Sequence, residues 1–467
     1  MTNSPTDWNC SGDTQSTTEI VRMNSSPRSP QESFPYSEDP TMAETRSRSE
    51  GPSWRLKCVH PFRHNVVQRI VSAVVLVPLV TTFLWLSPAF AATTVCSFAT
   101  SVCSYEYAWL ATRIRLRILA GWQKFEELST RPGTDASDHD NEHQDCVDTD
   151  EARSQDEVLE RCAVTNLALR FCRGNNCLAA FCGAVVVCIV SSTAFVLTDE
   201  WLHELRSTEL YKYRWQFPVA SGFVAGLCAC MAPDWQFAVV TLINYLMLVL
   251  LVMHSAACAT VPGFCNFVIM RRQIFLSGVT VILLFRFASA RNRIEAFVAF
   301  MLDVLGLVYV LGPLSVIVAF VDDNNRSLFR KLLIALLYVV WASDTGAYIV
   351  GKALAYFKYP YYHPLAPHLS KTKDYEGTLG AIIFGVVAMA SASAILDLPG
   401  SVATQVGYTV VAVIFGRLGD LFESMLKRAA GVKDSGTLIP GHGGVLDRID
   451  ALMFATIVFS RYYGLRF

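Results

Sequence analysis

Carboxylate, lysine and arginine side chains alternate over a short polar stretch near the carboxyl end of the chain. Asp420, Ser424 and Lys427 follow one another at i, i+4 and i+7, so on a helix they share one face. After a glycine-rich turn, Asp447 and Asp450 lie three residues apart at the start of an apolar run. Carboxylates repel a phosphate unless a divalent cation lies between them. The pattern therefore predicts an oxygen-ligated Mg²⁺ site for phosphate chemistry.

Positive side chains surround these acids and would hold phosphate groups. They are Lys427, Arg428, Lys433 and Arg448. The turn Gly441-His442-Gly443-Gly444 would let backbone N–H groups approach phosphate oxygens closely. Each charge embedded in a bilayer costs about 2.5–3.5 kcal/mol on insertion scales, so a cluster of them indicates function. We expect this region to bind the phosphate chain of a nucleotide.

The run from Ser424 to Asp450 resembles the signature of the phosphatidate cytidylyltransferase (CDP-diacylglycerol synthase) family. That signature reads Ser, two residues, Lys-Arg, four residues, Lys-Asp, then a Pro-x-His-Gly-Gly turn and Asp-Arg-x-Asp. Its fixed positions are filled here by Ser424, Lys427, Arg428, Lys433, Asp434, Pro440, His442, Gly443, Gly444, Asp447, Arg448 and Asp450.

A block further upstream is also similar to the family. It begins at Asp344-Thr345-Gly346 and ends at Glu376-Gly377. Between them the family usually reads Ser-Pro-Lys-Lys-Thr-x-Glu-Gly. This chain keeps the serine, one lysine and the Glu-Gly pair, but Lys371 replaces the proline and Asp374 replaces the threonine.

The resemblance implies transfer of CMP from CTP to phosphatidate, which yields CDP-diacylglycerol and pyrophosphate by Mg²⁺-assisted in-line attack on the α-phosphate of CTP. A phosphate monoester is mostly ionised at neutral pH, so the nucleophile needs no strong base. The implied metal ligands are Asp420 and Asp447, with Asp450 and Asp344 as weaker candidates, and a second monovalent or divalent cation stays open. The implied catalytic residues are Asp420, Lys427, Arg428, Lys433, Asp434, His442, Asp447 and Arg448. The implied substrate-binding residues are Ser424, Gly443, Gly444, Ser370, Lys373, Glu376 and Asp344.

The expected partners are CTP, phosphatidate and the lipid bilayer, with a homodimer as the assembly and no nucleic acid. The endoplasmic reticulum membrane is the expected location, and a plastid or mitochondrial inner membrane is the alternative. Alternative functions are a CTP-dependent lipid-alcohol kinase, a related lipid cytidylyltransferase, and a non-catalytic membrane scaffold or transporter. A serine hydrolase is disfavoured because no nucleophile elbow surrounds Ser424.

Composition indicates a membrane protein. Of the 467 residues, 52% are hydrophobic and 17% are charged, and the mean hydropathy is +0.34, whereas soluble chains carry about 25% charged residues. Because a bilayer needs about 20 apolar residues per helix, we predict an all-α polytopic fold with eight to ten transmembrane helices and a polar catalytic site at one membrane face. The candidate spans are 66–86, 89–110, 178–198, 217–233, 236–257, 297–320, 328–350, 379–397, 401–422 and 449–465, with a weaker stretch at 274–287 that is interfacial or paired through Arg286.

The predicted organisation has five parts. They are a disordered extension (1–60), a first transmembrane hairpin (61–121), an acidic disordered insertion (122–170), middle transmembrane helices (171–296) and a catalytic membrane domain (297–467). Two apolar spans, 379–397 and 401–422, meet at a tight turn, so the chain must cross the bilayer and return. The polar segments 351–378 and 423–448 therefore face the same side and can form one site.

Overall fold

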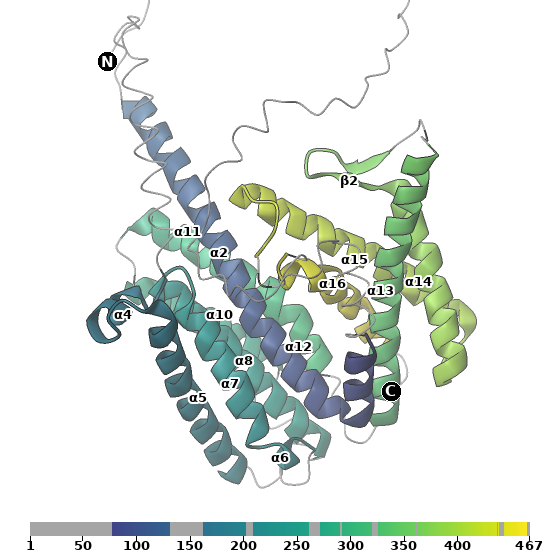
Figure 1. The fold of residues 1–467 in the computed structure, drawn as a ribbon, viewed down its shortest axis with the longest axis horizontal. Helices are drawn as coiled ribbons and strands as arrows, with labels where there is room; N and C mark the ends of the chain where they lie inside the picture. The colour runs from purple at the N-terminus through teal and green to yellow at the C-terminus, as the bar shows by residue number, and fades with distance from the viewer. Residues whose placement is uncertain are drawn as a thin grey trace, which may run out of the picture. The chain divides into compact units, whose positions relative to one another are not determined.

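The computed structural model describes residues 77–130, 162–201, 209–260, 271–289, 292–319, 326–357, 359, 363–436, 438 and 443–464. All of them belong to one compact unit, Leu56–Phe467. The described residues form helices and a single two-stranded hairpin (Figure 1). The predictions made for residues 1–60, for the acidic residues 131–161 and for His442 lie outside the described part of the chain.

The helices follow one another with short connections. The first half contains a short helix Val77–Leu86, α2 (Pro88–Thr130), α4 (Thr165–Phe171), α5 (Asn176–Trp201), α6 (Glu209–Lys212), α7 (Gln216–Cys230) and α8 (Trp235–Thr260). The second half contains α10 (Arg271–Ser289), α11 (Arg293–Gly306), the π-helical turn η4 (Leu307–Leu311), α12 (Gly312–Ala319) and α13 (Arg326–Tyr356). It ends with the strands β1 (Pro364–Ala366) and β2 (Ser370–Asp374), and with α14 (Tyr375–Leu396), α15 (Val402–Ala430) and α16 (Leu446–Gly464).

Six of the described helices are long and apolar enough to cross a membrane. They are Asn176–Thr198, Trp235–Ala256, Arg272–Ser289, Arg293–Val318, Ser327–Tyr356 and Tyr375–Leu396. The chain is therefore a multi-pass membrane protein with an all-helical fold, as its sequence predicts.

The number of spans differs from the prediction of eight to ten. The expected spans 89–110, 401–422 and 449–465 are helical, as parts of α2, α15 and α16, but they do not meet the same length and hydropathy criterion. Their polar side chains explain this, because Glu106 and Asp450 are buried inside the bundle rather than exposed to lipid.

The stretch 274–287 is a full helix, α10, and it meets the criterion for a span. Its Arg286 is buried and paired, because Nε lies 2.6 Å from Asp303 Oδ2 on α11 and Nη2 donates to Asp303 Oδ1 at 3.1 Å. A buried arginine is tolerated at this depth when a carboxylate on the neighbouring helix neutralises it.

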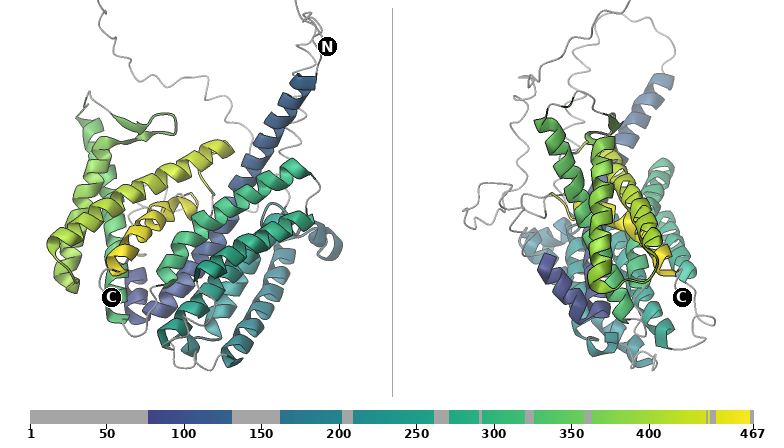
Figure 2. Two further views of the ribbon diagram at one scale, coloured as in Figure 1. Left: turned by 180° about the vertical axis from the view of Figure 1, so that it is seen from behind. Right: turned by 90° about the vertical axis from the view of Figure 1, so that its right-hand side faces the viewer.

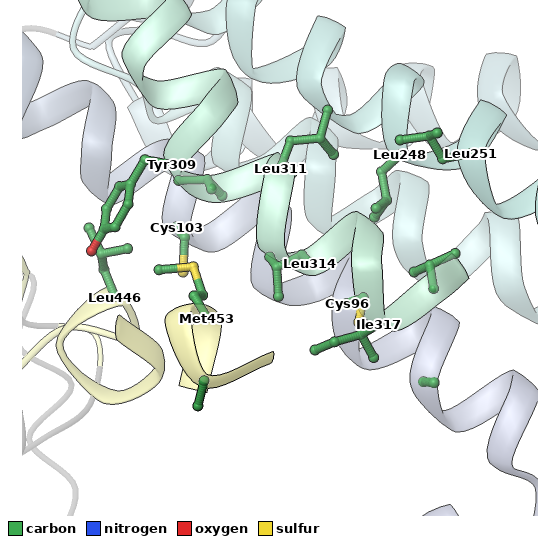
Figure 3. Packing of buried hydrophobic residues seen from close by; sticks show 14 of the residues in the cluster. Cys96, Cys103, Leu248, Leu251, Tyr309, Leu311, Leu314, Ile317, Leu446 and Met453 are labelled. Atoms are coloured by element: carbon green, nitrogen blue, oxygen red, sulfur yellow. The ribbon is translucent and has the colours of Figure 1, made fainter. Parts of the chain in front are cut away.

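The predicted boundaries of the acidic insertion, 122 and 170, fall inside helices. The helix α2 continues to Thr130, and α4 already begins at Thr165. The helix α2 belongs to the core of the bundle, where it contacts α7, α8, α11, α12, α15 and α16. Figure 3 shows Cys103 of α2 next to Met453 of α16, with Tyr309 and Leu446 close by, in one apolar cluster.

The helices α15 and α16 approach each other closely at Gly419. A Cβ atom at this position would lie 2.8 Å from the carbonyl oxygen of Asp450 and 2.6 Å from Phe454 Cδ2. Only glycine allows this separation without movement of α16. The close approach brings the acidic residues of the two helices together.

Candidate active site

Two polar segments on either side of the α14–α15 pair meet in the structure. The β1–β2 hairpin precedes α14 and lies beside α15 in both views of Figure 2. Lys373 of β2 reaches α15, where its Nζ lies 2.5 Å from Asp420 Oδ1. The inference that segments 351–378 and 423–448 share one side of the membrane agrees with this contact.

Three carboxylates form an acidic cluster between α15 and α16. One ligand oxygen each from Asp420, Glu423 and Asp450 lies within 4.8 Å of the other two. Glu423 is 1% exposed and Asp450 is 5% exposed. Glu423 Oε1 and Asp450 Oδ2 are buried without a hydrogen-bond partner. Buried carboxylate oxygens without donors are costly, and a hard divalent cation would satisfy them with its preferred oxygen ligands.

Positive side chains lie around Asp420. Besides the ion pair, Lys373 Nζ donates to the Asp420 carbonyl at 2.6 Å and to Ser424 Oγ at 2.9 Å. Arg417, one turn earlier on α15, places Nη1 3.4 Å from Asp420 Oδ2. Asp344 of α13 is exposed and lies within electrostatic range of the same group of charges. These cations border the acidic cluster and are suited to hold phosphate oxygens.

Asp447 lies outside the acidic cluster, which differs from its predicted role as a main metal ligand. Its Oδ1 lies 2.6 Å from Lys427 Nζ, and the same ammonium lies 2.7 Å from Glu423 Oε2. Its Oδ2 accepts hydrogen bonds from the N–H groups of Ser435, at 3.1 Å, and Gly444, at 2.9 Å. Both oxygens of Asp447 are therefore used to hold the turn that leads into α16.

The partners of Glu423 and Asp447 shift their pKa values in opposite directions. Burial, with the Asp447 carboxylate nearby, raises the pKa of Glu423 to about 8. Burial alone would also raise the pKa of Asp447, but hydrogen bonds with Glu423, Lys427 and Gly444 N–H lower it below its ordinary value. A cation bound beside Glu423 would favour its charged form.

The hairpin residues have local roles that the family signature does not specify. Asp374, which replaces the usual threonine, is buried and caps α14, because its Oδ1 accepts the Gly377 N–H at 2.6 Å. Glu376 Oε1 lies 2.8 Å from His363 Nδ1, at the start of the hairpin rather than in the acidic cluster. Ser370 begins β2.

The remaining predicted residues lie on the turn between α15 and α16. Arg428 donates to the carbonyl of Leu369 at 3.4 Å, which links the hairpin to the end of α15. Lys433, Asp434 and Arg448 are exposed. Their exposure leaves them accessible to a charged substrate. Gly443 adopts a left-handed backbone with φ of +80°, which favours glycine at this position.

Three residues near the site were not predicted as site residues. Glu423 lies at i+3 from Asp420, so its spacing already places it near the same helical face. Arg417 lies one turn before Asp420, in an otherwise apolar stretch of α15. Glu106 of α2 contacts the turn before α16 from a distant part of the chain, and no local spacing pattern marks it.

Comparison with known proteins is consistent with this site. The sequence profile of the Cytidylyltransferase family matches residues 171–465, which include every residue of the acidic cluster. The chain belongs to the cytidylyltransferase family. Among curated members, it is 42% identical over 135 residues to a phosphatidate cytidylyltransferase of Staphylococcus epidermidis, covering 29% of this chain and 49% of that protein. It is also 42% identical over 153 residues to the phosphatidate cytidylyltransferase of Haemophilus influenzae, covering 31% of this chain and 49% of that protein. The cytidylyltransferase chain thus spans about half the length of the curated relatives it matches.

Proposed function

We propose that this cytidylyltransferase-family protein transfers CMP from CTP to phosphatidate and releases pyrophosphate. The observation that carries the proposal is the acidic cluster of Asp420, Glu423 and Asp450, with its unpartnered buried oxygens and adjoining lysine and arginine side chains. The names of the curated relatives support phosphatidate as the lipid substrate.

The cluster fits a Mg²⁺ ion, which Asp420, Glu423 and Asp450 would hold. When bound, Mg²⁺ would neutralise the charge of the CTP phosphates. This ligand set replaces the predicted Asp447 with Glu423, because both Asp447 oxygens already accept hydrogen bonds or pair with Lys427. Asp447 and Lys427 would instead keep the turn and the cluster in place.

The reaction joins an oxygen of the phosphatidate phosphate to the α-phosphorus of CTP. The bond from that phosphorus to the oxygen bridging to the β-phosphate breaks, and pyrophosphate leaves with the electron pair. The attacking phosphate is already ionised, so the protein has to position it, reduce repulsion and stabilise the leaving charge. Lys373, Arg417 and Arg448 are the cations we assign to these tasks, with Lys433 on the exposed turn for the departing phosphates.

The test is the incorporation of radiolabelled CTP into lipid by the purified protein, with added phosphatidate and Mg²⁺. We expect CDP-diacylglycerol as the product and no incorporation after chelation of divalent cations. Asp420→Asn, Glu423→Gln and Asp450→Asn should each reduce the rate by at least about a hundredfold, because a bound metal contributes several kcal/mol of charge stabilisation.

Asp397→Asn is the matched control. Asp397 ends α14 with φ of +52°, a conformation that asparagine tolerates, and the change removes one carboxylate away from the cluster. Near-normal activity of two of the three cluster variants would refute the metal assignment. Incorporation that depends on a lipid alcohol instead of phosphatidate would refute the substrate and favour a CTP-dependent kinase. The homodimer and the endoplasmic reticulum location stay predictions.

A further inference from the structure

Glu106 of α2 is completely buried against the turn that leads into α16. Its exposed fraction is 0%. Its Oε1 accepts the Val445 N–H at 2.9 Å, and its Oε2 accepts the Leu446 N–H at 2.7 Å. The hydroxyl of Ser435 also donates to Oε2 at 3.3 Å. Both carboxylate oxygens therefore bind the segment that joins α15 to α16.

The position of these bonds is decisive. The first N–H groups of a helix have no partner within the helix, and a carboxylate there is also favoured by the helix dipole. In α16 this carboxylate comes from a residue 340 positions earlier in the chain. Asp447 holds the same turn from within α16, through the N–H groups of Ser435 and Gly444. Two carboxylates thus clamp one turn from two helices.

Glycine makes the approach of Glu106 feasible. A Cβ atom at Gly444 would lie 2.6 Å from Glu106 Oε2, and one at Gly436 would lie 2.7 Å from Oε1. Both distances are too short for a side chain to be accommodated without movement of Glu106. The turn is therefore shaped around this carboxylate.

We infer that Glu106 is a positioning residue of the acidic cluster. It sets the start of α16 and so sets where Asp450, one turn later, stands relative to Asp420 and Glu423. The helix α2 lies outside the residues that match the family profile, yet it contacts both α15 and α16 and passes beside them in Figure 1. The catalytic unit therefore includes α2.

The catalytic importance of this residue rests on the proposed function, but its effect on the cluster can be measured without turnover. Mn²⁺ is a suitable probe because its binding to the purified full-length protein can be followed by electron paramagnetic resonance. Outer residues that orient metal ligands typically contribute about 10–100-fold to metal affinity or activity. We expect Glu106→Ala to weaken Mn²⁺ binding by about tenfold or more, on that scale, and to reduce the rate of CTP incorporation.

Two conservative variants separate positioning from charge. Glu106→Asp keeps the charge but withdraws the carboxylate by one methylene, so it should behave like the alanine variant. Glu106→Gln keeps one acceptor oxygen and places an amide donor against the second N–H group, so it should give an intermediate Mn²⁺ affinity. If Glu106→Ala does not fold, the aspartate and glutamine variants decide the question.

Thr112→Ala is the matched control on α2. Thr112 is buried, and its hydroxyl donates to the Ala108 carbonyl of its own helix at 2.8 Å. This variant should keep the wild-type Mn²⁺ affinity. Wild-type affinity in the glutamine and aspartate variants, or an equal loss in Thr112→Ala, would overturn the inference. A wild-type protein that binds Mn²⁺ but makes no CDP-diacylglycerol would refute the proposed function alone, because the Glu106 comparison would still stand.

Discussion

Asp447 and Glu423 share one lysine, since Lys427 Nζ lies 2.6 Å from Asp447 Oδ1 and 2.7 Å from Glu423 Oε2. The remaining partners separate their roles. Asp447 accepts two backbone N–H groups, whereas Glu423 keeps one oxygen buried without a donor. At the scale of a residue, the supply of nearby donors thus distinguishes a carboxylate that shapes the backbone from one that is available to a cation.

Asp374 offers a test at the same scale. Asp374→Ala should lower the free energy of unfolding by about 1 kcal/mol, because it removes the cap of α14 and leaves the Gly377 N–H without its acceptor. Asp374→Thr, which restores the residue usual in the family, should lose less because a threonine hydroxyl can cap the helix.

Thermal unfolding of the purified protein in detergent measures these differences. Ser401→Ala is the comparison, since Ser401 caps α15 through the Thr404 N–H at 3.2 Å but is exposed. Water can replace that cap, so we expect a smaller loss. An unchanged unfolding midpoint in Asp374→Ala would contradict the capping role.

At the scale of helices, the separation of α15 and α16 depends on Gly419. Gly419→Ala would place a Cβ atom 2.8 Å from the Asp450 carbonyl oxygen, and a backbone atom cannot rotate away as a side chain can. We expect α16 to shift and activity to fall by about tenfold to a hundredfold, because a displacement of about 1 Å at a catalytic site can have that effect.

Gly407→Ala on the same helix is the control. A Cβ atom at Gly407 would meet no atom within 4 Å, so this variant should keep wild-type activity and gain slightly in helix stability. Initial rates normalised to membrane-inserted protein make the comparison. Equal rates for the two glycine variants would show that close packing at Gly419 does not govern the site.

Local spacing explains which parts of this arrangement the sequence could predict. The periodicity of α15 placed Asp420, Ser424 and Lys427 on one face, and the crossing of two apolar spans placed Lys373 on the same side. The family signature added the turn before α16. Glu106 could not be predicted as a partner of Leu446, because packing of helices far apart in the chain brings them together. Asp447 was predicted as a metal ligand because spacing does not show which N–H groups a carboxylate accepts.

At the scale of the whole molecule, the described helices bury two separate groups of charges. One is the acidic cluster with its cations, between α15, α16 and the hairpin. The other joins α10 to α11 through Arg286 and Asp303, with Gln236 of α8 accepting a further hydrogen bond from Arg286. Arg286 and Asp303 neutralise each other, whereas the acidic cluster keeps carboxylate oxygens without donors. We therefore regard the Arg286–Asp303 pair as structural.

A double-mutant cycle on Arg286 and Asp303 tests this separation. Arg286→Met and Asp303→Leu should each lower the free energy of unfolding by about 3–5 kcal/mol, because each leaves a buried charge without its partner, whereas the double variant should recover most of that loss. Arg272→Met on α10 removes an exposed charge and should have little effect. Thermal unfolding in detergent measures the cycle, and the KM for CTP should stay at the wild-type value in the double variant, because the pair is not part of the acidic cluster. A large change in that KM, or single variants as stable as the wild type, would show that the pair is coupled to catalysis or is dispensable.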